Sequence, residues 1–191
     1  FSKKISQIVS DLNRVQGIDP QVSAYVLNGD SREIERLLEK LPHVVRWVVT
    51  SPPYPTEHDY TRITRIELEL LALVRNLSDL RAIKRLMLRS NSKNIYSTDN
   101  DYELIKRCKR ISHIVDRVSR KARRKEYGFA RYYPRVIGEY FGGLYRHLQG
   151  LGKAVPRGTR CAYVLGQQCS YFGCFVPTAD IVAHMLSLIH I

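Results

Sequence analysis

Apolar residues alternate between helical and strand-like spacing along the first 50 residues of the chain. Apolar positions three or four residues apart predict an amphipathic helix over 3–16. A short β-rich run at 24–27 precedes a second helical pattern over 32–41. The near-continuous apolar run at 44–50 is typical of a parallel strand that is covered on both faces. The order helix, strand, helix, strand predicts a doubly wound α/β sheet.

Helical spacing dominates the rest of the chain. It occurs over 57–74, around 80–87, over 103–125 and over 135–151. A second strand-like run follows at 159–165, and a last helix is expected to begin at Pro177, which suits a first helical turn. We therefore expect one incomplete α/β domain over 1–191, with a helical insertion at about 57–132 between two strands.

Positive charge gathers inside this insertion. The formal net charge of the chain is +13, and residues 105–136 alone hold 12 Lys and Arg against 2 Asp and Glu. Such a local excess of positive charge indicates a surface that binds a polyanion; the alternative is an ordinary solvated helix face. The residues expected to contact phosphates are Arg117, Arg120, Lys121, Arg123, Arg124 and Lys125.

Composition narrows the class of protein. No run of 18 apolar residues is present, which argues against a membrane span, and no apolar signal-peptide core follows Phe1. The four cysteines lack the spacing of a disulfide framework or a zinc site, so we expect no metal, and Cys161 and Cys169 are expected to be buried free thiols. A cytoplasmic protein fits these features.

The apolar run at 44–50 stops abruptly at Ser51-Pro52-Pro53-Tyr54-Pro55. Prolines cannot continue a strand ladder, and ligands of doubly wound sheets bind beyond the carboxyl ends of strands. Pro52 and Pro53 offer carbonyl acceptors in a stiff loop, Ser51 adds a hydroxyl, and Tyr54 adds an aromatic face. These groups suit a planar ligand that carries an NH₂ group.

An exocyclic base amine matches that description. Its lone pair is conjugated into the ring, so acceptors that draw its hydrogens out of the ring plane make it a better nucleophile. Such preorganised contacts are each worth about 3 kcal/mol. The base has to leave the duplex to reach the loop, and stacking on Tyr54 offsets part of that cost.

The segment Val48 to Tyr54 resembles the catalytic motif of the DNA amino-methyltransferases, which modify cytosine N4 or adenine N6. Asn28-Gly29-Asp30-Ser31 resembles the preceding motif, whose acidic residue contacts the adenine of S-adenosylmethionine. Asp30 or Ser31 is also expected to cap the following helix. His58 to Arg62, Tyr133 to Leu148 and Ala162 to Gly166 are similar to later segments of the same family.

This resemblance implies a partial Rossmann-like methyltransferase sheet and S-adenosylmethionine as cofactor, with Gly29, Asp30 and Ser31 as its contacts. It also implies a prokaryotic or phage source and double-stranded DNA as the partner, with the target base flipped out of the helix. The catalytic residues would be Ser51, Pro52, Pro53 and Tyr54, and the initial Ser favours cytosine N4 over adenine N6. His58 and His147 are expected to be polar supports rather than catalysts.

Parts of the family pattern are absent. No strand in the chain leads into a Gly-rich cofactor loop, and Asp19 is a weak candidate for the acidic residue that grips the ribose. Residues 186–191 do not resemble the next strand of the family and are interpreted as a non-native tail. We therefore expect a fragment that is inactive by itself.

Three other interpretations remain open. Pro52-Pro53-Tyr54 is also a ligand motif for WW domains. A similar loop, usually beginning with Asn, serves methyltransferases that act on RNA bases or protein amides. The basic segment at 105–136 can also act as a nucleic-acid-binding module without enzymatic activity.

Overall fold

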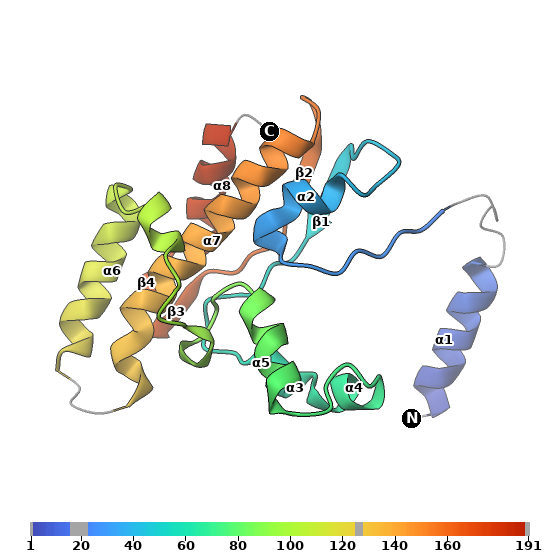
Figure 1. Cartoon of the computed structure of the whole chain (residues 1–191), viewed down its shortest axis with the longest axis horizontal. Helices are drawn as coiled ribbons and strands as arrows, with labels where there is room; N and C mark the ends of the chain where they lie inside the picture. The colour runs from blue at the N-terminus through green and yellow to red at the C-terminus, as the bar shows by residue number, and fades with distance from the viewer. Residues whose placement is uncertain (1, 16–22, 125–127, 190–191) are drawn as a thin grey trace.

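A computed structural model describes residues 2–15, 23–124 and 128–189 as a mixed α/β structure that is mostly helical (Figure 1). The α-helices are α1 (Ser2–Val15), α2 (Ile34–Leu38), α3 (Tyr60–Ile63), α4 (Arg65–Leu70), α5 (Leu77–Leu86), α6 (Lys109–Ala122), α7 (Tyr133–Ala154) and α8 (Thr178–Ile189). Short 3₁₀ turns are η1 (Ser31–Glu33), η2 (Ser92–Asn94), η3 (Asp101–Leu104) and η4 (Phe129–Tyr132). The strands are β1 (Trp47–Thr50), β2 (Arg160–Tyr163), β3 (Gln168–Tyr171) and β4 (Cys174–Val176).

The strands β1 and β2 pair in parallel, in a register that runs from Trp47 opposite Arg160 to Thr50 opposite Tyr163. This confirms a parallel pair with a helical crossover between its strands. The expectation that the strand at 44–50 is covered on both faces is wrong, because Trp47 and Val49 of β1 are 65% and 76% exposed. Helix α7 packs on the opposite face, where its His147 reaches Tyr163.

The core lies around α7, which runs between α6 and α8 and packs on the β3–β4 hairpin (Figure 1). Its largest fully buried side chains include Tyr140, Phe141 and Tyr171. The hairpin was not expected from the sequence. Phe172 and Gly173 both have positive φ, which is the geometry of a two-residue type I′ turn. The ring of Phe172 lies 5.3 Å from that of Tyr133, so Tyr133 packs against the hairpin.

Three expected elements differ from the structure. Residues 24–27 are extended and exposed, because no described strand pairs with them. The helix expected over 57–74 is two short helices, α3 and α4, which meet at Thr64. The helix expected over 103–125 begins only at Lys109, because Asp101 is buried in the η3 turn and Cys108 has an extended backbone.

Other boundaries follow the sequence more closely. Helix α7 begins at Tyr133, two residues before the predicted start at 135, with Pro134 in its first turn. Helix α8 continues to Ile189, and its Leu186 and Ile189 pack against the core.

Every side chain of α1 from 3 to 14 is exposed, and Asp19 lies outside the described residues. Among the described helices, none is both long and apolar enough to cross a membrane.

Candidate functional site

The Ser51–Tyr54 loop begins where β1 ends, at the carboxyl end of the parallel pair. Its first residue is tied to the neighbouring strand. The Ser51 hydroxyl lies 3.3 Å from the carbonyl oxygen of Val164, to which it donates, and 3.3 Å from Oη of Tyr54. The single proton of the Ser51 hydroxyl goes to Val164, so the Tyr54 hydroxyl is the donor in the second contact. One lone pair of the Ser51 oxygen then stays available to a ligand. The loop is therefore held at both ends while its hydroxyl remains an acceptor.

The backbone of the loop leaves two acceptors without donors. The Tyr54 N–H donates to Oη of Tyr60 at 3.1 Å, and the Tyr54 carbonyl accepts from the N–H of Thr56. Within the described part of the chain, no group donates a hydrogen bond to the carbonyl of Pro52 or Pro53. Both residues are partly buried, and the proline rings limit rotation of the backbone, so these carbonyl oxygens have a restricted direction and no donor among the described residues.

A buried tyrosine of α7 lies in the electrostatic neighbourhood of this loop. Burial, together with the nearby hydroxyls of Tyr60 and Tyr54, raises the pKa of Tyr140, so its hydroxyl keeps its proton at neutral pH. The ring is fully buried, and its oxygen has no hydrogen-bond partner among the described residues. Tyr140 therefore brings a buried, protonated hydroxyl into the neighbourhood of the Tyr54 and Tyr60 hydroxyls.

The second predicted motif, at Gly29 to Ser31, forms a helix start. The Asp30 carboxylate accepts from the backbone N–H of Arg32 at 2.9 Å, which confirms Asp30 as the cap. The same carboxylate pairs with the Arg32 guanidinium at 2.6 Å, and Arg32 also reaches the buried Asp101 at 3.0 Å. Gly29 is exposed. In this arrangement Arg32 occupies the oxygens that the sequence assigns to a cofactor.

His147 of α7 links Ser31 of the second motif to Tyr163, on the strand that pairs with β1 just before the Ser51–Tyr54 loop. Its Nδ1 lies 2.8 Å from the carbonyl oxygen of Ser31, and its Nε2 lies 2.8 Å from Oη of Tyr163. A carbonyl only accepts, so Nδ1 carries the proton and Nε2 accepts from the Tyr163 hydroxyl. Tyr163 pairs with Thr50, the residue before Ser51. His147 is therefore the polar support that the sequence predicted.

The protonation of His147 gives the first testable prediction. Burial lowers the pKa of His147, against the opposing effect of the Ser31 carbonyl. The unfolded chain takes up this proton near pH 6.5, before the folded chain does, so this contribution to stability is present above that pH and is lost as the pH falls. We expect the urea midpoint to drop between about pH 7 and pH 5, and His147→Gln to flatten that drop.

The matched control is His184→Gln, because His184 is exposed on α8. Its replacement should leave the slope of midpoint against pH unchanged. A slope that is the same in His147→Gln and in the parent chain would show that the bridge does not hold the neutral imidazole.

Four basic residues at the C-terminal end of α6 and just beyond it line one hollow of about 360 Å³, and we call this surface the α6 face: Arg117, Arg120, Lys121 and Arg124. Two of them also hold the hairpin: Arg117 donates to the Phe175 carbonyl and Lys121 to the Phe172 carbonyl, both at 2.8 Å. Arg123 lines an adjacent hollow with Arg120. Lys125 lies outside the described residues. The structure thus brings together four of the six predicted phosphate contacts.

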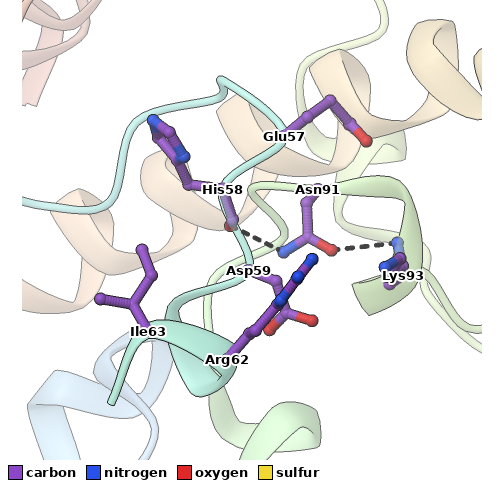
Figure 2. A pocket seen from close by; sticks show the side chains of 7 residues that line it. All are labelled: Glu57, His58, Asp59, Arg62, Ile63, Asn91 and Lys93. Carbon is purple, nitrogen blue, oxygen red and sulfur yellow. Dashed lines mark hydrogen bonds between the residues drawn. The ribbon is translucent and has the colours of Figure 1, made fainter. Parts of the chain in front are cut away.

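The bridge that His147 makes and the hollow that Arg62 and Lys93 share carried no local sequence signal. His147 lies far along the chain from Ser31, and no motif marks such a bridge. Arg62 and Lys93, on α3 and η2, line a hollow (Figure 2) whose first lining residue along the chain, Glu57, is three residues after Tyr54. The described residues contain no cluster of His, Cys, Asp and Glu that would hold a metal ion. No protein-family model matches the chain, and neither a curated protein nor a solved structure matches it.

Proposed function

We propose that this chain carries the base-binding part of an S-adenosylmethionine-dependent DNA amino-methyltransferase, with cytosine N4 favoured over adenine N6. The observation that carries the proposal is the loop at the carboxyl end of β1. There Ser51 Oγ and the carbonyls of Pro52 and Pro53 present acceptors that the described residues leave available. Three acceptors beside the ring of Tyr54 suit an amine on a planar base.

The chain's own residues would act by holding the amine. Acceptors at Pro52, Pro53 and Ser51 draw the two amine hydrogens out of the base plane, so the nitrogen lone pair is less conjugated. They also stabilise the positive charge that develops on the nitrogen, and they do so without reorganisation because the prolines fix the backbone. Tyr54 stacks on the base and offsets part of the cost of taking it from the duplex.

We also propose that β1 and β2 belong to a Rossmann-like, doubly wound sheet. Their parallel pairing and the helical crossover between them support it. S-adenosylmethionine would supply the methyl group. Of its proposed contacts Gly29, Asp30 and Ser31, Asp30 has the expected carboxylate, but Arg32 holds it and His147 holds the Ser31 carbonyl. These residues do not fit the cofactor in this arrangement, and we derive no step through it.

The acceptor class is the direct test. The longest open reading frame that encodes this chain is incubated with S-adenosylmethionine carrying a tritiated methyl group and with equal masses of DNA, RNA or unrelated protein. We expect label in DNA only. Label in RNA or protein alone would replace the proposal by the RNA or amide alternative. DNA binding without label in any acceptor would favour a non-enzymatic binding module, which the basic hollow on α6 also supports.

The α6 face gives a quantitative prediction for DNA binding by the chain itself. Arg120 and Arg124 are exposed and make no ion pair among the described residues. Each of Arg120→Ala and Arg124→Ala should weaken binding to a random duplex and reduce the slope of log Kd against log salt by about 0.9. Fluorescence anisotropy from low to moderate salt measures that slope.

Lys40→Ala is the control for this measurement, because Lys40 is also an exposed cation but follows α2 and lies outside the basic hollow. Equal slopes for Lys40→Ala and Arg120→Ala would show that the α6 face has no special part in binding DNA.

A further inference from the structure

A hollow of about 420 Å³ opens three residues beyond Tyr54 (Figure 2). This volume lies within the range of small-molecule sites. Its lining comes from the segment that leads into α3 and from the segment around η2. The lining residues are Glu57, His58, Asp59, Arg62, Ile63, Asn91 and Lys93.

Hydrogen bonds between the two segments fix the shape of the hollow. The Glu57 carboxylate accepts from the backbone N–H of Ser92 at 3.0 and 3.1 Å and from its hydroxyl at 2.6 Å. Asn91 Nδ2 donates to the His58 carbonyl at 3.0 Å (Figure 2). Because both segments are tied on either side, a ligand would meet walls that are already formed.

The acidic side chains of the lining are held by donors in the walls. Asp59 pairs with Lys84 of α5 at 2.8 Å and accepts from the Thr61 hydroxyl at 2.7 Å. Burial acts to raise the pKa of Asp59, but these hydrogen bonds outweigh it and hold the pKa below its ordinary value. With Glu57 bound to Ser92, both carboxylates are turned to partners of their own.

The cations of the lining have no such partners. Neither the Arg62 guanidinium nor the Lys93 ammonium forms an ion pair or a side-chain hydrogen bond with any described residue. Figure 2 shows Arg62 reaching from α3 toward Asn91 and Lys93 on the facing segment. Two unpaired cations on opposite walls make the hollow attractive to an anion.

The hollow is also joined to the Ser51–Tyr54 loop. Tyr60 is the first residue of α3 and accepts the N–H of Tyr54, two residues before Arg62. The ring of His58 lies 6.4 Å from that of Tyr60. An anion in the hollow would therefore be a near neighbour of whatever the loop holds.

We propose that this hollow binds a phosphate group of the nucleotide whose base enters the Ser51–Tyr54 loop, with Arg62 and Lys93 as its two contacts. The proposal rests on the proposed function. A nucleotide joins its base to a phosphate through one sugar, so one site for each group would orient the flipped nucleotide. The α6 face, by contrast, meets duplex phosphates without regard to the flipped base.

The test uses the 191-residue chain and NMR titrations with deoxycytidine, deoxycytidine 5′-monophosphate and inorganic phosphate. We expect the monophosphate to bind about tenfold more tightly than the nucleoside, as charge-assisted hydrogen bonds to two cations allow. Amide signals of Asn91 and Lys93 should shift with the monophosphate and with phosphate. In the double variant Arg62→Gln, Lys93→Gln the two affinities should become equal.

The matched control is Arg81→Gln, because Arg81 is an exposed arginine of α5 outside the hollow. It should preserve the tenfold advantage. Backbone amide spectra of each variant report whether it folds, and the single variants Arg62→Gln and Lys93→Gln replace the double one if it does not. A phosphate advantage that survives in these variants, or phosphate shifts confined to α6, would overturn the proposal.

The nucleoside separates this proposal from the proposed function. If deoxycytidine shifts the NMR signals of residues in the Ser51–Tyr54 loop but the hollow binds no phosphate, only the proposed phosphate site is wrong. If phosphate binds the hollow while deoxycytidine leaves the loop unchanged, base binding fails, and the hollow is an anion site without the nucleotide assigned to it.

Discussion

Replacing Ser51 by Ala should reduce methyl transfer by about two orders of magnitude or more while leaving the fold intact. In the proposed function the hydroxyl is one of three acceptors for the base amine, and the loss of one preorganised transition-state contact has this magnitude in other enzymes. Ser51 is exposed, and its two contacts to Val164 and Tyr54 are long, at 3.3 Å. Its removal should therefore change the free energy of unfolding by only about 0.5 kcal/mol.

The measurement is the initial rate of labelled methyl transfer to DNA by the open reading frame that encodes this chain, beside a thermal melt of each variant. Ser97→Ala is the matched control, because Ser97 is also exposed and lies away from the loop. Its rate should equal that of the parent. An undiminished rate in Ser51→Ala would remove Ser51 from the chemistry.

Tyr54 separates stacking from hydrogen bonding in the same assay. Tyr54→Phe keeps the aromatic face and loses only the contact between Oη and Ser51, so its rate should stay closer to that of the parent than the rate of Ser51→Ala does. Tyr54→Ala also removes the aromatic face on which we propose that the base stacks, a contact worth about 1–3 kcal/mol, so its rate should be the lower of the two. Equal rates in the Phe and Ala variants would show that the ring does not stack on the base.

Replacing Gly142 by Ala should destabilise the chain by about 3 kcal/mol or more. Helix α7 meets the η3 turn at this residue, and a Cβ there would overlap the backbone carbonyl of Asp101. The turn has little freedom to move away, because the buried Asp101 is paired with Arg32 at 3.0 Å and Arg146 at 3.1 Å. Displacing it would disturb both ion pairs, which outweighs the gain of about 1 kcal/mol from Ala in a helix.

Differential scanning fluorimetry measures this effect, which corresponds to a fall in Tm of roughly 6–12 °C for a chain of this size. Gly150→Ala, on the same helix, is the control. A Cβ there would meet Cγ2 of Ile34 at 3.1 Å, which calls for a shift of only a few tenths of an ångström. Its Tm should change little. Similar Tm values for the two variants would contradict the close approach of α7 and η3.

The position of the candidate site was readable from the sequence for local reasons. Prolines directly after an apolar run end a strand, and β1 indeed ends at Thr50, before Ser51. The capping role of Asp30 was likewise local, since its side chain bonds a backbone group two residues ahead. Such features depend on neighbours in the chain and need no knowledge of the fold.

The features that were missed depend on contacts between distant segments. An apolar run cannot say whether one face or two faces of its strand are covered, and the open face at Trp47 and Val49 follows from what packs on β1. Positive charge along α6 could be counted, but the use of Arg117 and Lys121 to hold the hairpin could not. The hairpin left one local signal, the glycine of its two-residue turn at Gly173.

The central claim is that the Ser51–Tyr54 loop presents a base amine for methylation. The most direct test is mass analysis of nucleosides from DNA that has been methylated by the open reading frame encoding this chain. The proposed function predicts a methyl group on an exocyclic nitrogen, with N4-methylcytosine favoured over N6-methyladenine. A methyl group on a ring carbon, as in 5-methylcytosine, would contradict it, because carbonyl and hydroxyl acceptors around an amine give no help to attack by carbon.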